Sequence, residues 1–118
     1  MATFTKKKLS GSTNGRGIKV VTTATTGTTI HTAVAGTTDF DEVWLFAYNG
    51  HTANVVLTIE FGGVSVPDDN IKVTLVWQAG LQLIVPGLIL QNECVVRAFA
   101  SVANVVVITG FVNNIAAA

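Results

Sequence analysis

The segment Val55-Val56-Leu57-Thr58-Ile59-Glu60-Phe61 alternates between two kinds of side chain. Its odd-numbered positions are all large and apolar, whereas Thr58 and Glu60 belong to the opposite set. Because successive side chains of a β-strand point to opposite faces, this alternation predicts a strand with one face on a core. Residues 71–77 repeat the pattern, with apolar odd-numbered positions up to and including Trp77.

Further β-strands are predicted on both sides of this segment. Val, Ile and Thr suit a pleated sheet, and clusters of Gly, Asn and Asp interrupt the chain about every ten residues, as in all-β sandwiches and barrels. Pro67 and Pro86 lie between predicted strands, and Pro86-Gly87 suits a type II turn. The predicted strands are residues 18–23, 28–34, 42–48, 55–61, 71–77, 81–85, 94–100 and 105–112. The predicted fold class is an all-β, antiparallel β-sandwich, jelly-roll-like, with about eight strands.

A scarcity of charge points to assembly. Charged residues make up 12% of the 118 residues, against roughly 25% in an ordinary soluble domain. Residues 43–48 and 105–108 are apolar on both faces, although a strand of an isolated sandwich should leave one face outside. A loop or another subunit could cover the second face, and the low charge favours another subunit. A Thr-rich monomer that stays soluble through its hydroxyls is the alternative.

Residues 1–17 are predicted to form an extended, basic, Gly/Ser/Thr-rich amino-terminal arm, and residues 18–118 the β-sandwich domain. The cations near the start are the candidate contacts with a neighbouring subunit: Lys6, Lys7, Lys8, Arg16 and Lys19. From residue 20 onward two cations accompany seven acids, so a basic arm would be attracted to the acidic body of a neighbour. A solvated tail that aids solubility is the other interpretation.

The chain offers little for catalysis, and we expect no enzymatic activity, no cofactor and no metal site. His31 falls in a predicted strand and His51 in a predicted turn, and their spacing to Cys94 matches no nucleophilic triad. The acidic clusters at residues 39–42 and 68–70 lack the spacing of a calcium loop. One cysteine and two separated histidines make no recognisable zinc ligand set.

Membrane and nucleic-acid partners are not expected either. No apolar segment follows the first lysines, so no signal peptide is predicted. Residues 73–92 and 98–118 are uncharged, but polar residues and glycines interrupt both, unlike a membrane helix. Phe4 is the only aromatic residue near the basic arm, and the acidic remainder of the chain would repel a polyanion.

Several segments, taken together, carry a resemblance: residues 8–20 (KLSGSTNGRGIKV), 41–47 (DEVWLFA), 85–92 (VPGLILQN), 95–100 (VVRAFA) and 110–113 (GFVN). The chain resembles the small β-sandwich virion proteins of tailed phages, of the capsid decoration (cement) type. The resemblance implies a structural protein that is made in the host cytoplasm and located on the capsid surface of the virion. Its implied partners are the major capsid protein, whose subunits it would brace, or another virion protein. It further implies a homo-oligomer, with a trimer among the options.

A neck, tail or fibre protein is the alternative, acting as a receptor- or glycan-binding module. Trp44, Tyr48 and Trp77 could then supply faces on which sugars stack. Each lies on a predicted strand within an apolar run, so packing in the core is the favoured prediction for all three.

Overall fold

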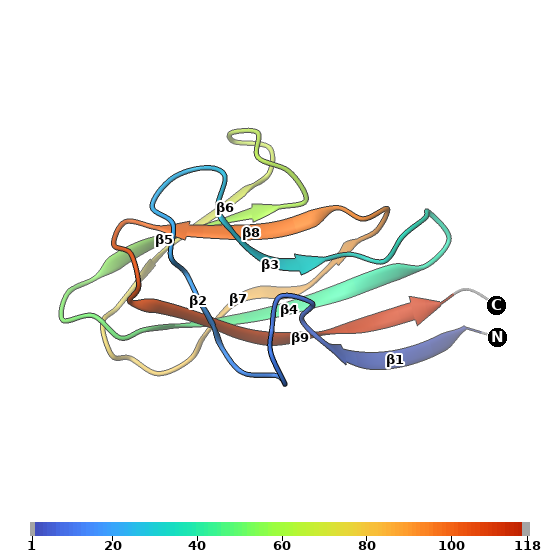
Figure 1. Ribbon diagram of the computed structural model, residues 1–118, viewed down its shortest axis with the longest axis horizontal. Helices are drawn as coiled ribbons and strands as arrows, with labels where there is room; N and C mark the ends of the chain where they lie inside the picture. Colours follow the sequence, from blue (N-terminus) through green and yellow to red (C-terminus); the bar gives the residue numbers. More distant parts are fainter. Residues whose placement is uncertain (1, 117–118) are drawn as a thin grey trace.

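The computed structural model describes residues 2–116, and these residues form nine β-strands and no helix. The strands are β1 (Thr3–Lys8), β2 (Ile18–Lys19), β3 (Thr28–Thr32), β4 (Phe40–Asn49), β5 (Val55–Phe61), β6 (Asn70–Leu75), β7 (Gln82–Leu90), β8 (Val95–Ala100) and β9 (Val106–Ala116). A five-stranded sheet contains β1, β2, β9, β4 and β7, and a four-stranded sheet contains β3, β8, β5 and β6 (Figure 1). Across the described range, no helix of a length and hydropathy that would cross a membrane is found.

The pairing of strands along the chain is that of a jelly roll. β1 and β2 both pair with β9, on the edge that β4 leaves free, so together they occupy one strand position. β3 pairs with β8, β4 with β7, and β5 with β6, all antiparallel. Counted from the two ends of the chain toward its middle, the first strand position therefore pairs with the last strand, the second with the second to last, and so on. This is the nested pairing of a jelly roll. The predicted all-β, antiparallel β-sandwich is confirmed.

The core lies between the two sheets and follows the predicted alternation. β5 has the predicted bounds, and its odd-numbered positions Val55, Leu57 and Ile59 are fully buried. On its other face Thr58 and Glu60 are buried too, at 3% and 1% exposed, so that face is covered more than the alternation predicts. Burying one large apolar side chain contributes roughly 1.5–3 kcal/mol, so the core is the main source of stability. The larger buried apolar side chains are Leu9, Val20, Ile30, Val43, Leu45, Val55, Leu57, Ile59, Leu75, Val85, Val96, Val106, Ile108 and Val112.

Several predicted strand ends are wrong; β2 stops at Lys19 instead of residue 23, and β9 continues to Ala116 instead of ending at residue 112. β6 ends at Leu75, so Trp77 lies in the following loop, 49% exposed, instead of facing the core. β7 continues to Leu90 through the predicted Pro86-Gly87 turn. The strand can do so because it lies at a sheet edge and its register against β4 shifts on both sides of Trp44. A proline at an edge or a bulge removes no hydrogen bond that the sheet needs.

The predicted arm contributes both an extended strand and a core residue. β1 pairs with the chain's own β9, from Thr3 opposite Ala116 to Lys8 opposite Phe111. Its six side chains are all exposed, so backbone hydrogen bonds attach it rather than burial. Leu9, which follows directly, is 1% exposed and lies in the core. The first seventeen residues and the rest of the chain therefore share one core.

A buried polar cluster joins both sheets to the segment after β1. His31 Nε2 on β3 is 2.7 Å from Asp41 Oδ2 on β4, and Asn114 Nδ2 on β9 donates to Asp41 Oδ1 at 2.9 Å. The Ser10 backbone N–H donates to His31 Nδ1 at 2.9 Å, which places the His31 proton on Nε2, facing Asp41. Because the three side chains are at most 7% exposed, their polar atoms depend on one another for hydrogen bonds.

Candidate functional site

The outer face of the five-stranded sheet carries a row of aromatic side chains. Along all ten residues of β4, buried positions alternate with half-buried ones. The buried apolar positions hold aliphatic side chains such as Val43 and Leu45, whereas the outward positions hold mostly aromatic ones. With one residue of β9, these define what we call the aromatic face: Phe40, Trp44, Phe46, Tyr48 and Phe111.

Trp44 lies at the centre of the aromatic face and is held on both sides. It is opposite Phe111 in the pairing of β4 with β9, and the two rings stack with centroids 6.1 Å apart and planes 15° apart. On the other side, a Cβ at Gly87 of β7 would lie 2.8 Å from Trp44 Cζ2. Gly87 also has a φ of +80°, which an L side chain rarely adopts. Glycine at this position therefore lets the indole lie against β7.

Glu42 gives the aromatic face a fixed negative charge. Trp44 Nε1 donates to Glu42 Oε1 at 2.7 Å, and Asn113 Nδ2 donates to the same oxygen at 3.0 Å. The Trp44 hydrogen bond first, and the Asn113 one second, hold the pKa of Glu42 below its ordinary value, because both stabilise the carboxylate. The carboxylate is therefore oriented and ionised at neutral pH.

The aromatic face extends to both edges of its sheet. On β7, Leu83 is opposite Phe46 and Ile89 is opposite Glu42, so both point outward, and they are 50% and 57% exposed. On β1, Phe4 is 71% exposed and pairs with Ile115, which itself lies opposite Phe40. Apolar side chains thus cross every strand position of this sheet on its outer side.

The structure brings three of the five predicted contact residues to one border of the aromatic face. Lys6 and Lys8 pair with Asn113 and Phe111, and Lys19 pairs with Val107, all of which point outward from β9. The Lys6 ammonium lies 4.2 Å from the centre of the Phe111 ring. We call Lys6, Lys8 and Lys19 the basic border.

The other two predicted contacts lie elsewhere. Lys7 pairs with Val112 and points to the opposite side of the sheet, and Arg16 is exposed in the turn before β2. Lys7 shares a hollow of about 500 Å³ with its two neighbouring lysines and Ser10, beside the end of β1. The five cations thus form a border and two separate points, not one patch.

The prediction that Trp44 and Tyr48 pack in the core is wrong. Both occupy outward positions of β4, because the inward positions between the sheets are taken by smaller side chains such as Leu45 and Ala47. Phe111 was missed as a partner of Trp44, since their pairing joins segments far apart in the sequence. The signal that was available is the division within β4, with mostly aromatic residues at even positions and aliphatic residues at odd ones.

The buried His31–Asp41 pair resembles part of a catalytic triad, but its surroundings give it a structural role. A triad needs a nucleophile on the free nitrogen of the histidine. Here that nitrogen accepts the backbone N–H of Ser10, while Ser10 Oγ accepts the Thr32 N–H at 2.7 Å. His31 and Asp41 are each 4% exposed. Within residues 2–116, no group of three or more His, Cys, Asp or Glu side chains is placed to hold a metal ion.

The fold defines the class of the protein as a jelly-roll β-sandwich, and the outer face of its five-stranded sheet carries a row of aromatic side chains. Comparisons with models of protein families, with curated proteins and with solved structures give no match. Jelly rolls occur in viral capsid proteins, lectins and cupins, so the fold alone selects no function. The function has to be argued from the surfaces of the molecule.

Proposed function

We propose that this protein is a non-enzymatic structural subunit of a tailed-phage capsid, a decoration (cement) protein that acts as a homo-oligomer. The observation that carries the proposal is the aromatic face. A sheet that formed only the outer layer of a monomer would carry polar side chains at these positions. Beside the half-buried aromatic rings, Phe4, Leu83 and Ile89 are 71%, 50% and 57% exposed, and contiguous exposed apolar surface typically marks a contact with another molecule.

The size of the aromatic face suits a specific interface. Four strand positions about 4.8 Å apart, with strands of about ten residues, give a sheet face of roughly 600 Å². A standard interface buries about 800 Å² on each partner, so the sheet face and its rim supply an area of the right order. The apolar centre with a charged border also matches the usual division of an interface into core and rim.

A second copy of the chain is the occupant that the charges favour. The face carries an ionised acid, Glu42, and a parallel row of cations in the basic border. In a symmetric pair, each copy can place its own cations against the acid of the other. Association through the aromatic face would also remove its apolar surface from water.

The capsid location is supported by the resemblance, by the jelly-roll fold and by the remaining cations. Lys7 points to the opposite side of its sheet and Arg16 is exposed in the turn before β2, so both can contact an acidic shell when copies associate. Bracing several shell subunits requires a multivalent binder, and an oligomer gains avidity from its linked copies.

Self-association is tested by the mass of the purified protein in native mass spectrometry and analytical ultracentrifugation. The wild type is expected to be an oligomer, and Ile89→Glu, which adds a charge at an exposed position of the face, is expected to be monomeric. Val66→Glu is the matched control, because Val66 is 77% exposed in the β5–β6 loop, away from the aromatic face. A monomeric wild type would overturn the proposal.

The capsid role is tested on purified particles of the phage that encodes the gene. Peptides of this protein are expected in mass spectrometry at many copies per particle, and the double variant Lys7→Gln, Arg16→Gln is expected to be depleted. This variant is preferable to removal of the first seventeen residues, because Leu9 belongs to the core. Particles that lack the protein, or that carry it only at the neck or tail, would contradict a decoration role.

A neck, tail or fibre module that binds a receptor or glycan is the second candidate. One observation favours it: Trp77 is 49% exposed beside Val76, which is 50% exposed, in the loop after β6. Exposed indole faces are suited to stacking on sugar rings. Glycan-array binding that is lost in Trp77→Ala, with the fold intact by circular dichroism, would support this candidate over the first.

A further inference from the structure

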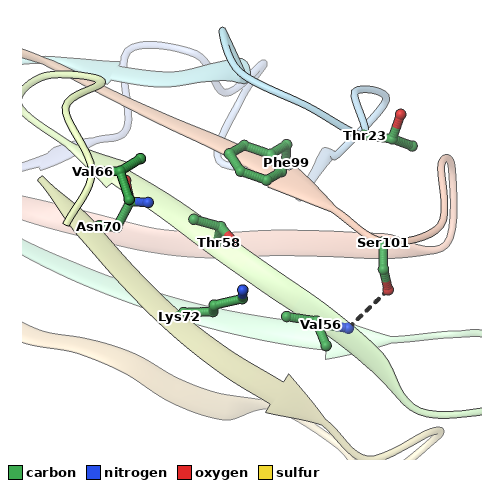
Figure 2. A pocket seen from close by; sticks show the side chains of 8 residues that line it. All are labelled: Thr23, Val56, Thr58, Val66, Asn70, Lys72, Phe99 and Ser101. Carbon is green, nitrogen blue, oxygen red and sulfur yellow. Dashed lines mark hydrogen bonds between the residues drawn. The ribbon is translucent and has the colours of Figure 1, made fainter.

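The four-stranded sheet has a pocket on its outer face, on the opposite side of the sandwich from the aromatic face. Its volume is about 520 Å³, within the range of roughly 300–1,000 Å³ that is usual for small-molecule sites. The floor is formed by side chains of β5, β6 and β8, and the rims by Thr23 and Val66 (Figure 2). The lining residues are Thr23, Val56, Thr58, Val66, Asn70, Lys72, Phe99 and Ser101.

Both loops that wall the pocket are fixed by carboxylates. Glu60, 1% exposed at the end of the floor, accepts hydrogen bonds from Thr25 Oγ1 and from the Gly27 N–H in the loop before β3. Asp69 Oδ2 accepts the Ser65 N–H at 3.0 Å in the β5–β6 loop. The walls are therefore preformed, because Glu60 holds the loop before β3 and Asp69 holds the β5–β6 loop.

Lys72 is the charged residue among those that line the pocket. Lys72 lies opposite Thr58 in the pairing of β5 with β6. In Figure 2 its nitrogen lies between the side chains of Thr58 and Val56. Among the residues that the structure describes, no carboxylate oxygen lies within 4.0 Å of it. A ligand with a negative charge would meet an uncompensated cation here.

Asn70 supplies a second unsatisfied group. Its Oδ1 is buried and has no hydrogen-bond donor among the described residues. Asn70 and Val66 both line the pocket, and Val66 is 77% exposed at its rim (Figure 2). Buried acceptors are rarely left unpaired, and one at a pocket wall is commonly completed by water or ligand. The missing partner has to be a donor, such as a hydroxyl.

We propose that this pocket binds an acidic sugar, that is, a sugar ring that bears a carboxylate. Lys72 pairs with the carboxylate, a ring hydroxyl donates to Asn70 Oδ1, and the hydroxyls of Thr23 and Thr58 accept or donate at the periphery. The Phe99 ring and the valines contact the C–H face of the sugar. An apolar carboxylic acid would satisfy Lys72 but not Asn70, and a neutral sugar would satisfy Asn70 but not Lys72.

The site is independent of the proposed capsid role, because it lies on the sheet that the aromatic face does not use. A decoration protein that packed through its five-stranded sheet would keep this pocket open to the medium. The proposal needs neither an oligomer nor a shell. It also does not involve Trp77, which lies beyond the end of β6.

The test is an NMR titration of the purified full chain with glucuronic acid, and separately with glucose and with phenylacetate. Glucuronic acid is expected to shift the amide signals of Lys72, Thr58 and Phe99. Glucose is expected to bind at least tenfold more weakly than glucuronic acid, and phenylacetate no more tightly than glucuronic acid. Lys72→Gln is expected to remove the preference for glucuronic acid over glucose. Trp77→Ala and Lys19→Gln are the matched controls and are expected to bind as the wild type does.

Three results would overturn the proposal: no shift with glucuronic acid up to its solubility limit, equal shifts with glucose, or unchanged binding by Lys72→Gln. Tighter binding of phenylacetate would replace it with a site for apolar acids. Because Lys72 is exposed, Lys72→Gln is expected to fold normally, and its amide spectrum reports this directly. A failed capsid assay leaves these outcomes untouched, and a failed titration leaves the mass measurements untouched.

Discussion

Replacing Asp41 by alanine is expected to be among the most destabilising single changes on a polar side chain. The Asp41 carboxylate accepts from His31 Nε2, from Asn114 Nδ2 and from the Val34 N–H, the last at 3.2 Å. In Asp41→Ala all three donors lose their partner at a site that is 4% exposed. Leaving a buried donor without its acceptor costs about 1–3 kcal/mol, and three donors are affected, so a loss of about 3–5 kcal/mol is expected. This is a large part of the roughly 5–15 kcal/mol that holds a domain folded.

Urea unfolding followed by tryptophan fluorescence measures this loss, at one fixed protein concentration because association adds to apparent stability. The control is Asp68→Ala, which removes an exposed carboxylate of the β5–β6 loop and is expected to change stability by less than about 0.5 kcal/mol. In the double variant His31→Ala, Asp41→Ala, the two losses are expected to be clearly less than additive, because they remove the same contact. Equal stabilities of Asp41→Ala and Asp68→Ala, or strict additivity with His31→Ala, would refute the view that this cluster ties the sheets together.

Three further outcomes are expected. Gly87→Ala should lower the free energy of unfolding in urea by about 1–3 kcal/mol more than Gly80→Ala does. Both glycines have a positive φ, but only Gly87 faces the Trp44 ring. Equal losses would contradict the packing of the indole on β7. Leu57→Ala should lower the free energy of unfolding by about 2–5 kcal/mol, because Leu57 is buried. The outward Leu83→Ala, measured on the monomeric Ile89→Glu background, should lower it by less than about 0.5 kcal/mol. Similar losses would mean that the faces of the sheet are misassigned. The pKa of the Glu42 carboxyl, followed by ¹³C NMR, should lie below the ordinary glutamate value, and Trp44→Phe should raise it because the indole donor is lost. Since the pKa is lower in the folded state, Glu42 contributes to stability at pH values above the ordinary glutamate pKa. This contribution is lost as the pH falls through the folded-state pKa.

The parts of the fold that follow from local pattern could be predicted. β5 was predicted at its observed bounds, because its alternation reports directly which side faces the core. The turn at Pro86-Gly87 was wrong because turn preference is local, whereas tolerance of a proline depends on the edge position of β7. Trp77 was placed in the core because the pattern of β6 continues past Leu75, although the strand itself does not.

The parts of the site that depend on distant pairing could not be predicted. The aromatic face requires Phe111 to lie beside Trp44, and the buried cluster requires Asn114 to reach Asp41 across 73 positions of sequence. Nothing in the local residue pattern chooses these partners. The basic residues were predicted as one arm, but pairing of β1 and β2 with β9 divides them between the two sides of a sheet. Register, which is a property of the whole fold, decides which cation joins which face.

The edges of the sandwich help to decide what kind of association its faces can make. Open edge strands invite unlimited pairing between copies, and proteins prevent this with lysines, prolines and bulges. β1 carries three consecutive lysines, β7 carries Pro86 between two register shifts, β3 shifts register before His31, and β6, the remaining edge, carries Lys72. These features disfavour growth by strand addition, which agrees with the proposed contact through the aromatic face. A contact through one face of each copy closes on itself, as a symmetric oligomer requires, whereas pairing through both edges would continue into a fibre.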